Sequence, residues 1–140
     1  VFSRTSDVWV QQAYVKASNT GLNDSFGSSI DLNEDGNIMA VGAFNEDSNA
    51  AGVNNDESNN SFGDSGAAYT FIRNGITWFQ KAYVKASNTD DSDRFGWSIG
   101  ISADGSTMAV GAMDEEGIAK GVNGDQNNNS SIKAGAVYLY

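Results

Sequence analysis

The stretch "WVQQAYVKASNT" at residues 9–20 returns almost letter for letter as "WFQKAYVKASNT" at residues 78–89. The offset is 78 − 9 = 69 residues, and the same offset relates "MAVGA" at 39–43 to "MAVGA" at 108–112. A unit that recurs at a fixed period usually stacks on its own copies, because one copy alone cannot bury its apolar face. The sequence therefore predicts two repeat units instead of one compact domain.

Composition and charge exclude several classes of protein. The chain has no Cys and no His, so it lacks disulfides, the usual catalytic base and the commonest transition-metal ligand. Its formal net charge of −10 repels nucleic acid and anionic membranes and favours hard cations as partners. No apolar run approaches the roughly 20 residues of a membrane span, and the first residues lack the pattern of a signal peptide. We expect no nucleic-acid partner and no membrane insertion.

The hydrophobic pattern has a period of two residues, which indicates strands. The first expected strand spans residues 8–16, and the second starts at Phe26 and ends at the turn Asp35-Gly36. A third strand, "NIMAVGAF", and a fourth, "GAAYTFIR", complete the unit, with a loop of about 20 residues between them. Four short antiparallel strands per 69-residue repeat, with no helical stretch, predict an all-β chain of β-propeller blades.

Four elements recur in the same order in both copies, and together they resemble the FG-GAP repeat of integrin-α-like propellers. They are Phe26-Gly27, Asp35-Gly36, Val41-Gly42-Ala43 and Gly66-Ala67, which return as Phe95-Gly96, Asp104-Gly105, Val110-Gly111-Ala112 and Gly135-Ala136. The segments 9–19 and 121–130 resemble most those of the bacterial branch of the family. The motif's final Pro is absent, since Phe44 and Met113 stand in its place.

The resemblance implies a propeller whose innermost strand begins at Phe-Gly and whose outermost strand contains the Trp. It also implies a secreted or cell-surface location and a role in adhesion or recognition. On that blade order residues 1–25 supply an outermost strand to a neighbouring or ring-closing blade. Residues 26–94 form the first blade, and residues 95–140 form a second blade that lacks its outermost strand. We therefore expect further copies of the repeat as partners, in a homo-oligomer or within a longer chain.

The turn at residues 31–36 is one candidate calcium site. Asp31, Asn33 and Asp35 precede Gly36 as in the opening of an oxygen-only calcium loop. The ninth position is Met39, however, and the second copy offers a poorer set of ligands. A plain hairpin turn is the alternative interpretation.

The long loops are a second candidate calcium site. Oxygen-bearing side chains alternate in both copies, and Glu46, Asp47, Asp114, Glu115 or Glu116 would add negative charge. The alternating residues are Asn54, Asp56, Ser58, Asn60, Asn123, Asp125, Asn127 and Asn129. The alternative is a solvated loop in which these side chains bond their own backbone.

Nothing in the spacing singles out a catalytic pair, so the sequence predicts no enzyme. It predicts a non-catalytic extracellular module for adhesion, recognition or self-assembly that calcium stabilises. The alternative is a carbohydrate-binding, lectin-like propeller. Such a propeller would place an exposed Trp or Tyr beside Asn and Asp between blades, whereas a structural module would bury its aromatic residues. Trp9, Trp78 and Trp97 are the residues in question.

Overall fold

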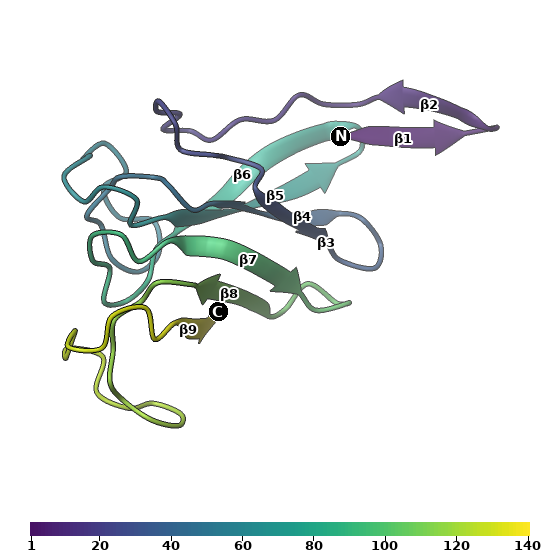
Figure 1. Ribbon diagram of the computed structural model, residues 1–140. Coiled ribbons are helices and arrows are strands. Elements are labelled where there is room, and N and C mark those ends of the chain that lie inside the picture. The colour runs from purple at the N-terminus through teal and green to yellow at the C-terminus, as the bar shows by residue number, and fades with distance from the viewer.

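The computed structural model describes residues 1–140 as nine β-strands in three antiparallel sheets, with no helix (Figure 1). The sheets have the orders β1-β2, β3-β4-β5-β6 and β7-β8-β9. The strands are β1 (Phe2–Thr5), β2 (Val8–Gln11), β3 (Ser29–Leu32), β4 (Ile38–Ala43), β5 (Ala67–Asn74), β6 (Thr77–Val84), β7 (Phe95–Ile101), β8 (Met108–Ala112) and β9 (Ala136–Leu139). No helix is present that could cross a membrane.

The four-stranded sheet follows the predicted strand order. The turn at Asp35-Gly36 joins β3 to β4, and Gly36 adopts a positive φ of 64°, which glycine tolerates best. The long loop then returns the chain to β5, which lies beside β4, and β6 forms the outer edge of the sheet. The all-β, antiparallel prediction is confirmed. The sheets have two, four and three strands, so only one of them has the four predicted strands, and no closed ring is present.

The two copies of the Phe-Gly motif differ in structure. β7 begins at Phe95, as predicted, whereas β3 begins only at Ser29 and Phe26 lies in the preceding turn. The neighbouring sheet supplies the physical reason. The backbone N–H of Phe95 donates to the carbonyl of Ser65 at 3.0 Å, and Gly66 forms a parallel bridge to Phe95. No equivalent sheet precedes Phe26, so that residue has no such partner.

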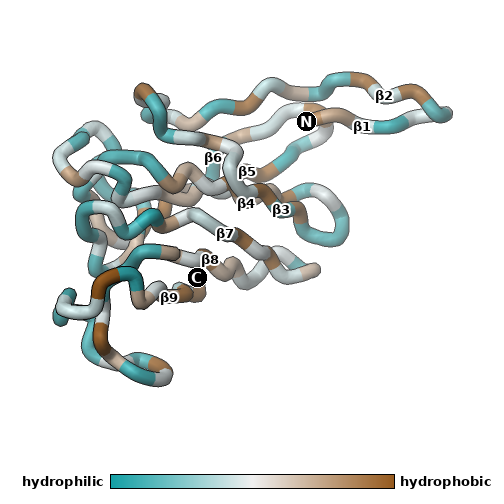
Figure 2. Tube along the Cα trace, viewed as in Figure 1, coloured by the Kyte–Doolittle hydropathy of each residue, from teal (hydrophilic) through white to brown (hydrophobic).

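The N-terminal segment forms its own hairpin at one end of the molecule (Figure 1). The predicted strand at 8–16 is shorter in the structure, because β2 ends at Gln11 and pairs with β1 alone. Val8, Trp9 and Val10 are exposed on this hairpin, where Figure 2 shows apolar positions at the periphery. The opposite end of the stack is β9, near the C-terminus.

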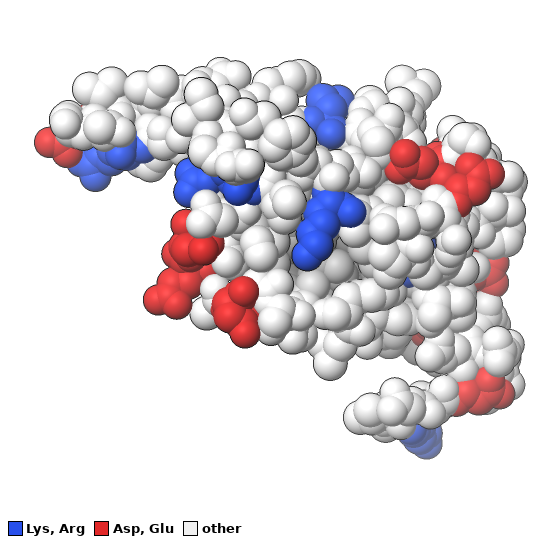
Figure 3. Space-filling model, turned by 180° about the vertical axis from the view of Figure 1, so that it is seen from behind, with Lys and Arg blue, Asp and Glu red and all other residues white.

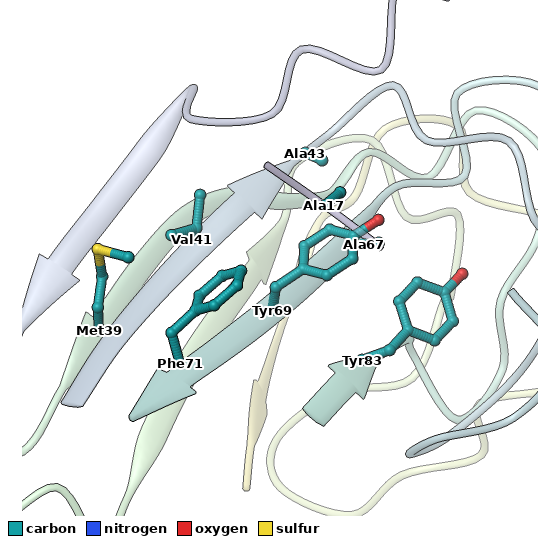
Figure 4. Packing of buried hydrophobic residues seen from close by; sticks show 8 residues of the cluster. All are labelled: Ala17, Met39, Val41, Ala43, Ala67, Tyr69, Phe71 and Tyr83. Carbon is teal, nitrogen blue, oxygen red and sulfur yellow. The ribbon is translucent and has the colours of Figure 1, made fainter. Parts of the chain in front are cut away.

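Two apolar clusters hold the sheets together. The first contains Met39, Val41, Tyr69, Phe71 and Tyr83, whose side chains project from one face of the four-stranded sheet (Figure 4). The second lies on the opposite face and joins this sheet to the next one. Its buried members are Ala40, Ala68, Val84, Ala86, Phe95, Met108, Val110 and Ala112. The alternation of side chains along β4 therefore gives each face of the sheet a different neighbour.

The glycines of the motif let the backbones of two sheets meet. A Cβ atom at Gly42 would collide with the carbonyl oxygen of Gly96 in the next sheet and with Ser29 Oγ. A Cβ atom at Gly66 would collide with the backbone of Phe95. The hydroxyl of Ser29 donates to the Gly96 carbonyl at 2.8 Å across the same contact. These glycines are needed because the adjacent sheets approach through main-chain atoms.

We predict that Gly42→Ala destabilises the chain by about 1–3 kcal/mol, the usual cost of overpacking. Gly111 occupies the same repeat position, and a Cβ atom there would meet only atoms of Ser98, because no sheet follows β9. Gly111→Ala is therefore the matched control and should cost much less. Urea unfolding of the two variants measures the difference, and equal costs would contradict stacking through Gly42.

Candidate functional site

A buried glutamate lies where the two repeat units meet. The Oε1 atom of Glu46 accepts hydrogen bonds from Asn19 Nδ2 at 2.7 Å and from the Tyr83 hydroxyl at 3.0 Å. Its Oε2 atom accepts from Lys85 Nζ at 2.8 Å and from the backbone N–H of Ser48 at 3.2 Å. The carboxylate therefore accepts four hydrogen bonds, from donors in three segments of the chain, since Tyr83 and Lys85 lie in the same one.

Lys85 is the cation of this site, and none of its side chain is exposed. Burial lowers the pKa of Lys85, and the charge of Glu46 opposes that effect. A second bond, from Nζ to Ser65 Oγ at 2.8 Å, fixes the ammonium group. Because the side chain of Glu46 is only 1% exposed, no substrate reaches the pair, and its chemical role is to join segments.

The tyrosines around the glutamate extend the network into the sheet. The hydroxyl of Tyr69 donates to Asn19 Oδ1 at 2.7 Å, so Asn19 connects Tyr69 to Glu46. Burial raises the pKa of both Tyr69 and Tyr83, and the nearby charge of Glu46 adds to the effect. Both hydroxyls therefore remain protonated donors at neutral pH.

The second repeat contains part of the same network. Glu115 is 5% exposed and accepts from Asn88 Nδ2 at 3.0 Å and from the Gly117 N–H at 2.9 Å. The Tyr138 hydroxyl donates to Asn88 Oδ1 at 2.6 Å, as Tyr69 does to Asn19. No lysine or arginine forms an ion pair with Glu115. Burial, helped by the charge of Glu115, raises the pKa of nearby Asp93 to about 6.

The sequence pattern indicated Glu46 only as extra charge for a calcium site and did not single out Lys85. The structure assigns the Glu46 carboxylate to a lysine of the same chain. One signal was available in the sequence, since the segment "AYVKASNT" repeats without change while its flanks vary. The repeated segment contains the kinds of residue that bind the glutamate, namely Tyr, Lys and Asn. Tyr14 and Lys16 are the first-copy counterparts of Tyr83 and Lys85.

Of the three candidate ligands in the turn at residues 31–36, two bond within the turn and one bonds the neighbouring sheet. Asn33 Oδ1 accepts from the N–H groups of Asn37 and Ile38, at 3.0 Å and 2.9 Å. Asp35 Oδ1 accepts from the Asn37 N–H at 2.8 Å, a bond that lowers the pKa of Asp35. Asp31 Oδ2 accepts from the Ile101 N–H at 2.9 Å and so points to the neighbouring sheet. The bonds of Asn33 and Asp35 are those of a hairpin turn.

The long loops show a similar pattern. Asp56 Oδ1 accepts from both the N–H and the hydroxyl of Ser58, at 2.9 Å and 2.6 Å, and this lowers the pKa of Asp56. Asp125 Oδ1 accepts from the N–H and the side-chain amide of Asn127, at 3.0 Å and 3.1 Å. Asn129 Nδ2 donates to Asp90 Oδ2, and no hydrogen bond involves the side chain of Asn60. No group of three or more Asp and Glu side chains gathers as a metal site anywhere in the chain.

Asn54 has a structural function in this loop. Its Oδ1 atom accepts from the Tyr83 N–H at 3.0 Å, while its own N–H donates to the Tyr83 carbonyl at 2.8 Å. The neighbouring Gly52 bonds both Lys85 and Ala86 through the backbone. Residues 52–54 therefore pair with the end of β6 and hold Lys85 over Glu46. Asn123 has a φ of 56°, close to the 55° of Asn54, but no β6 equivalent lies beside it.

Comparison with known families divides the chain into two repeat units, and the contacts of Glu46 join them. The FG-GAP repeat matches residues 9–71 and 78–140, and the chain belongs to the FG-GAP repeat family. Asn19, Glu46 and Tyr69 fall within the first matched unit, and Tyr83 and Lys85 come from the second. No curated protein and no solved structure matched the chain. The bacterial branch stays a prediction.

We predict that Lys85→Met destabilises the chain by about 3–5 kcal/mol, because it leaves the charge of Glu46 buried without a cation. Glu115→Gln is the matched comparison and should cost less than about 1 kcal/mol, because no cation pairs with Glu115 in this chain. The double variant Glu46→Gln/Lys85→Met should cost less than the sum of its single changes. Urea unfolding measures all four, and equal costs for Lys85→Met and Glu115→Gln would contradict the assigned role of the pair.

Proposed function

We propose that the chain is a non-catalytic, extracellular recognition module of the β-propeller type, and that its long loops bind a protein or glycan partner. The family membership supports the class of function, since FG-GAP repeats are structural and binding modules. The arrangement of the loops supports the location of binding. The loops 45–64 and 114–133 leave the stacked sheets on the same side, opposite the hairpin turns (Figure 1).

Loops on a rigid scaffold are the usual place for binding residues. The first loop is fixed to the scaffold, because Glu46 binds Lys85 and residues 52–54 pair with the end of β6. The outer parts of the loops are exposed and differ in sequence between the copies. Figure 3 shows acidic side chains toward the long-loop side and around the hairpin turns, with basic ones between them. A partner with basic or hydrogen-bonding groups fits such a surface.

The lectin-like alternative meets only part of its requirement. A groove of about 580 Å³ lies between residues 12–18 and the β5–β6 hairpin, and it is lined by Tyr14, Trp78 and Gln80. Tyr14 is 81% exposed, as a sugar-stacking residue would be. No Asn or Asp lines this groove, however. The groove therefore supports glycan binding less well than the loops support a general recognition role.

The recognition proposal is tested by exchanging the outer part of one loop. We predict that replacing residues 124–131 by the eight residues 55–62 changes binding to a panel of extracellular matrix proteins and immobilised glycans. The exchange retains Glu115 and residues 121–123, so the melting temperature should change little. The reciprocal exchange is the control for loop position. Binding that stays the same in both variants would contradict a recognition role for the loops.

Calcium stabilisation of the long loops stays a separate proposal, which the net charge of −10 and the repeated oxygen donors support. An ion would have to displace the bonds that Asp56 and Asp125 now accept. We predict that, if the ion binds, chelator lowers the melting temperature by mass action and Asp56→Ala/Asp125→Ala removes that sensitivity. Identical melting curves with calcium and with chelator would contradict this proposal and leave the recognition proposal unaffected.

A further inference from the structure

Two residues near the N-terminus are exposed although their second copies are buried. Tyr14 is 81% exposed and Lys16 is also exposed. Tyr83 and Lys85, which lie 69 residues later, are 2% and 0% exposed and bind Glu46. The local sequence is the same, so the difference comes from the surroundings. Neither the Tyr14 hydroxyl nor Lys16 Nζ forms a hydrogen bond like those of Tyr83 and Lys85.

Glu115, in contrast, is an acceptor that lacks two of the donors that Glu46 has. Two donors, Asn88 and Gly117, match those that Asn19 and Ser48 provide for Glu46. The hydroxyl and the ammonium group that complete the Glu46 site have no counterpart at Glu115. A buried carboxylate without a cation lowers the stability of the folded chain. In the first repeat, the equivalent carboxylate of Glu46 has Lys85 as its cation.

The backbone around Glu115 also leaves space for a strand. β9 pairs only with β8, so its other edge is free. On the far side, residues 121–123 correspond to residues 52–54, which pair with the end of β6. Val122 is 90% exposed, whereas Val53, which bridges to Val84, is 47% exposed. By correspondence with β5, β6 and residues 52–54 of the first repeat, we define a slot between β9 and residues 121–123, which no strand of this chain occupies.

The β7-β8-β9 sheet has a hollow on the face that no other sheet covers. A groove of about 390 Å³ is lined by Trp97, Gly111, Met113, Gly135 and Val137, among others. Gly111 and Gly135 are the second copies of Gly42 and Gly66, which receive the backbone of Phe95 and Gly96. Val137 is 72% exposed on this face.

The other end of the molecule carries the piece that fits this hollow. Phe26-Gly27 is the first copy of Phe95-Gly96, and Phe26 is only half-buried, whereas Phe95 is fully buried. Phe26 follows the segment that contains Tyr14 and Lys16, as Phe95 follows Tyr83 and Lys85. One molecule therefore offers at its N-terminal end all the groups that another lacks at its C-terminal end.

We infer that a second copy of this chain docks head to tail, with its residues 14–17 in the slot between β9 and residues 121–123. The Tyr14 hydroxyl and Lys16 Nζ of one copy then bind Glu115 of the other. In this contact β9 of one copy pairs with residues 14–17 of the other in the register that β5 has with β6. Val137 then lies opposite Val15, and Tyr138 lies opposite Tyr14. The contact is heterologous, so each copy has one donor end and one acceptor end. This assembly goes beyond the proposed recognition role and needs no ligand.

Two differences between the sites affect the strength of docking. Ala134 of the second repeat stands where the first repeat has Ser65. Lys16 Nζ therefore lacks the hydrogen bond that Lys85 Nζ donates to Ser65 Oγ. Val1 and Phe2 already pair with residues 11–13 of their own chain, where Leu139 and Tyr140 of the other copy would otherwise pair. Removal of Val1 and Phe2 should therefore tighten the docking.

A disulfide test measures the contact directly, since the chain has no Cys. We expect Val15→Cys and Val137→Cys chains, mixed under mild oxidation, to give a crosslinked dimer that contains one of each. Directly opposed residues of an antiparallel pair have the Cα separation that a disulfide needs. Each variant alone is the control and should give far less crosslinked dimer. Mixtures that crosslink no more than the single variants would overturn the inference.

A charge test measures the role of Lys16 by sedimentation at a series of protein concentrations. We expect Lys16→Glu to weaken self-association by at least about tenfold, because like charges then meet in a desolvated site. Lys120→Glu is the control for net charge, since Lys120 is exposed and forms no ion pair. Lys16 is exposed in the single chain, so its variant should keep the wild-type circular dichroism. Equal association of the Lys16 and Lys120 variants, or a wild type that remains a monomer at all concentrations, would overturn the inference.

Discussion

The buried pair of Lys85 and Glu46 is the interaction on which the rest of the structure depends. Lys85 belongs to the second matched repeat unit, and Glu46 belongs to the first. The strand that precedes Lys85, β6, is the outer strand of the four-stranded sheet, although its residues 78–84 belong to the second matched repeat unit, so the repeat units of the sequence do not coincide with the sheets. The four-stranded sheet is completed by β6, the first strand of the second unit. The pair therefore links successive units more strongly than a connecting loop alone would.

The contacts between sheets explain why the repeat retains small residues at fixed places. Gly42 and Gly66 leave room for main-chain atoms of Phe95 and Gly96, and Ser29 bonds the Gly96 carbonyl. Asn19 and Asn88 connect a tyrosine to a glutamate in each unit. The repeated letters thus mark contacts between segments. The outer parts of the long loops accept hydrogen bonds from these segments at Glu57 and Gln126, but their sequences differ between the copies.

Most of the fold could be predicted from the sequence, because turns and periodicity are local signals. Asp35-Gly36 forms the expected hairpin, and the alternation of apolar residues gives β4 two different faces. The site could not be predicted, because it depends on which segments are neighbours. "AYVKASNT" has one sequence but two environments, so no local rule separates the exposed Lys16 from the buried Lys85. The sequence pattern predicted Asn54 as a metal ligand. In the structure, Asn54 Oδ1 accepts a hydrogen bond from the Tyr83 N–H.

The measurement that tests this account most directly is amide hydrogen exchange of the two copies of "AYVKASNT" by NMR in dilute solution. Identical sequences have the same intrinsic exchange rates, so any difference reports structure alone. The N–H of Lys85 donates to the Gly52 carbonyl at 2.8 Å and that of Tyr83 to Asn54 Oδ1, whereas Tyr14 and Lys16 have no such bonds. The account predicts slow exchange at Tyr83 and Lys85 and fast exchange at Tyr14 and Lys16. Equal rates in the two copies would contradict it.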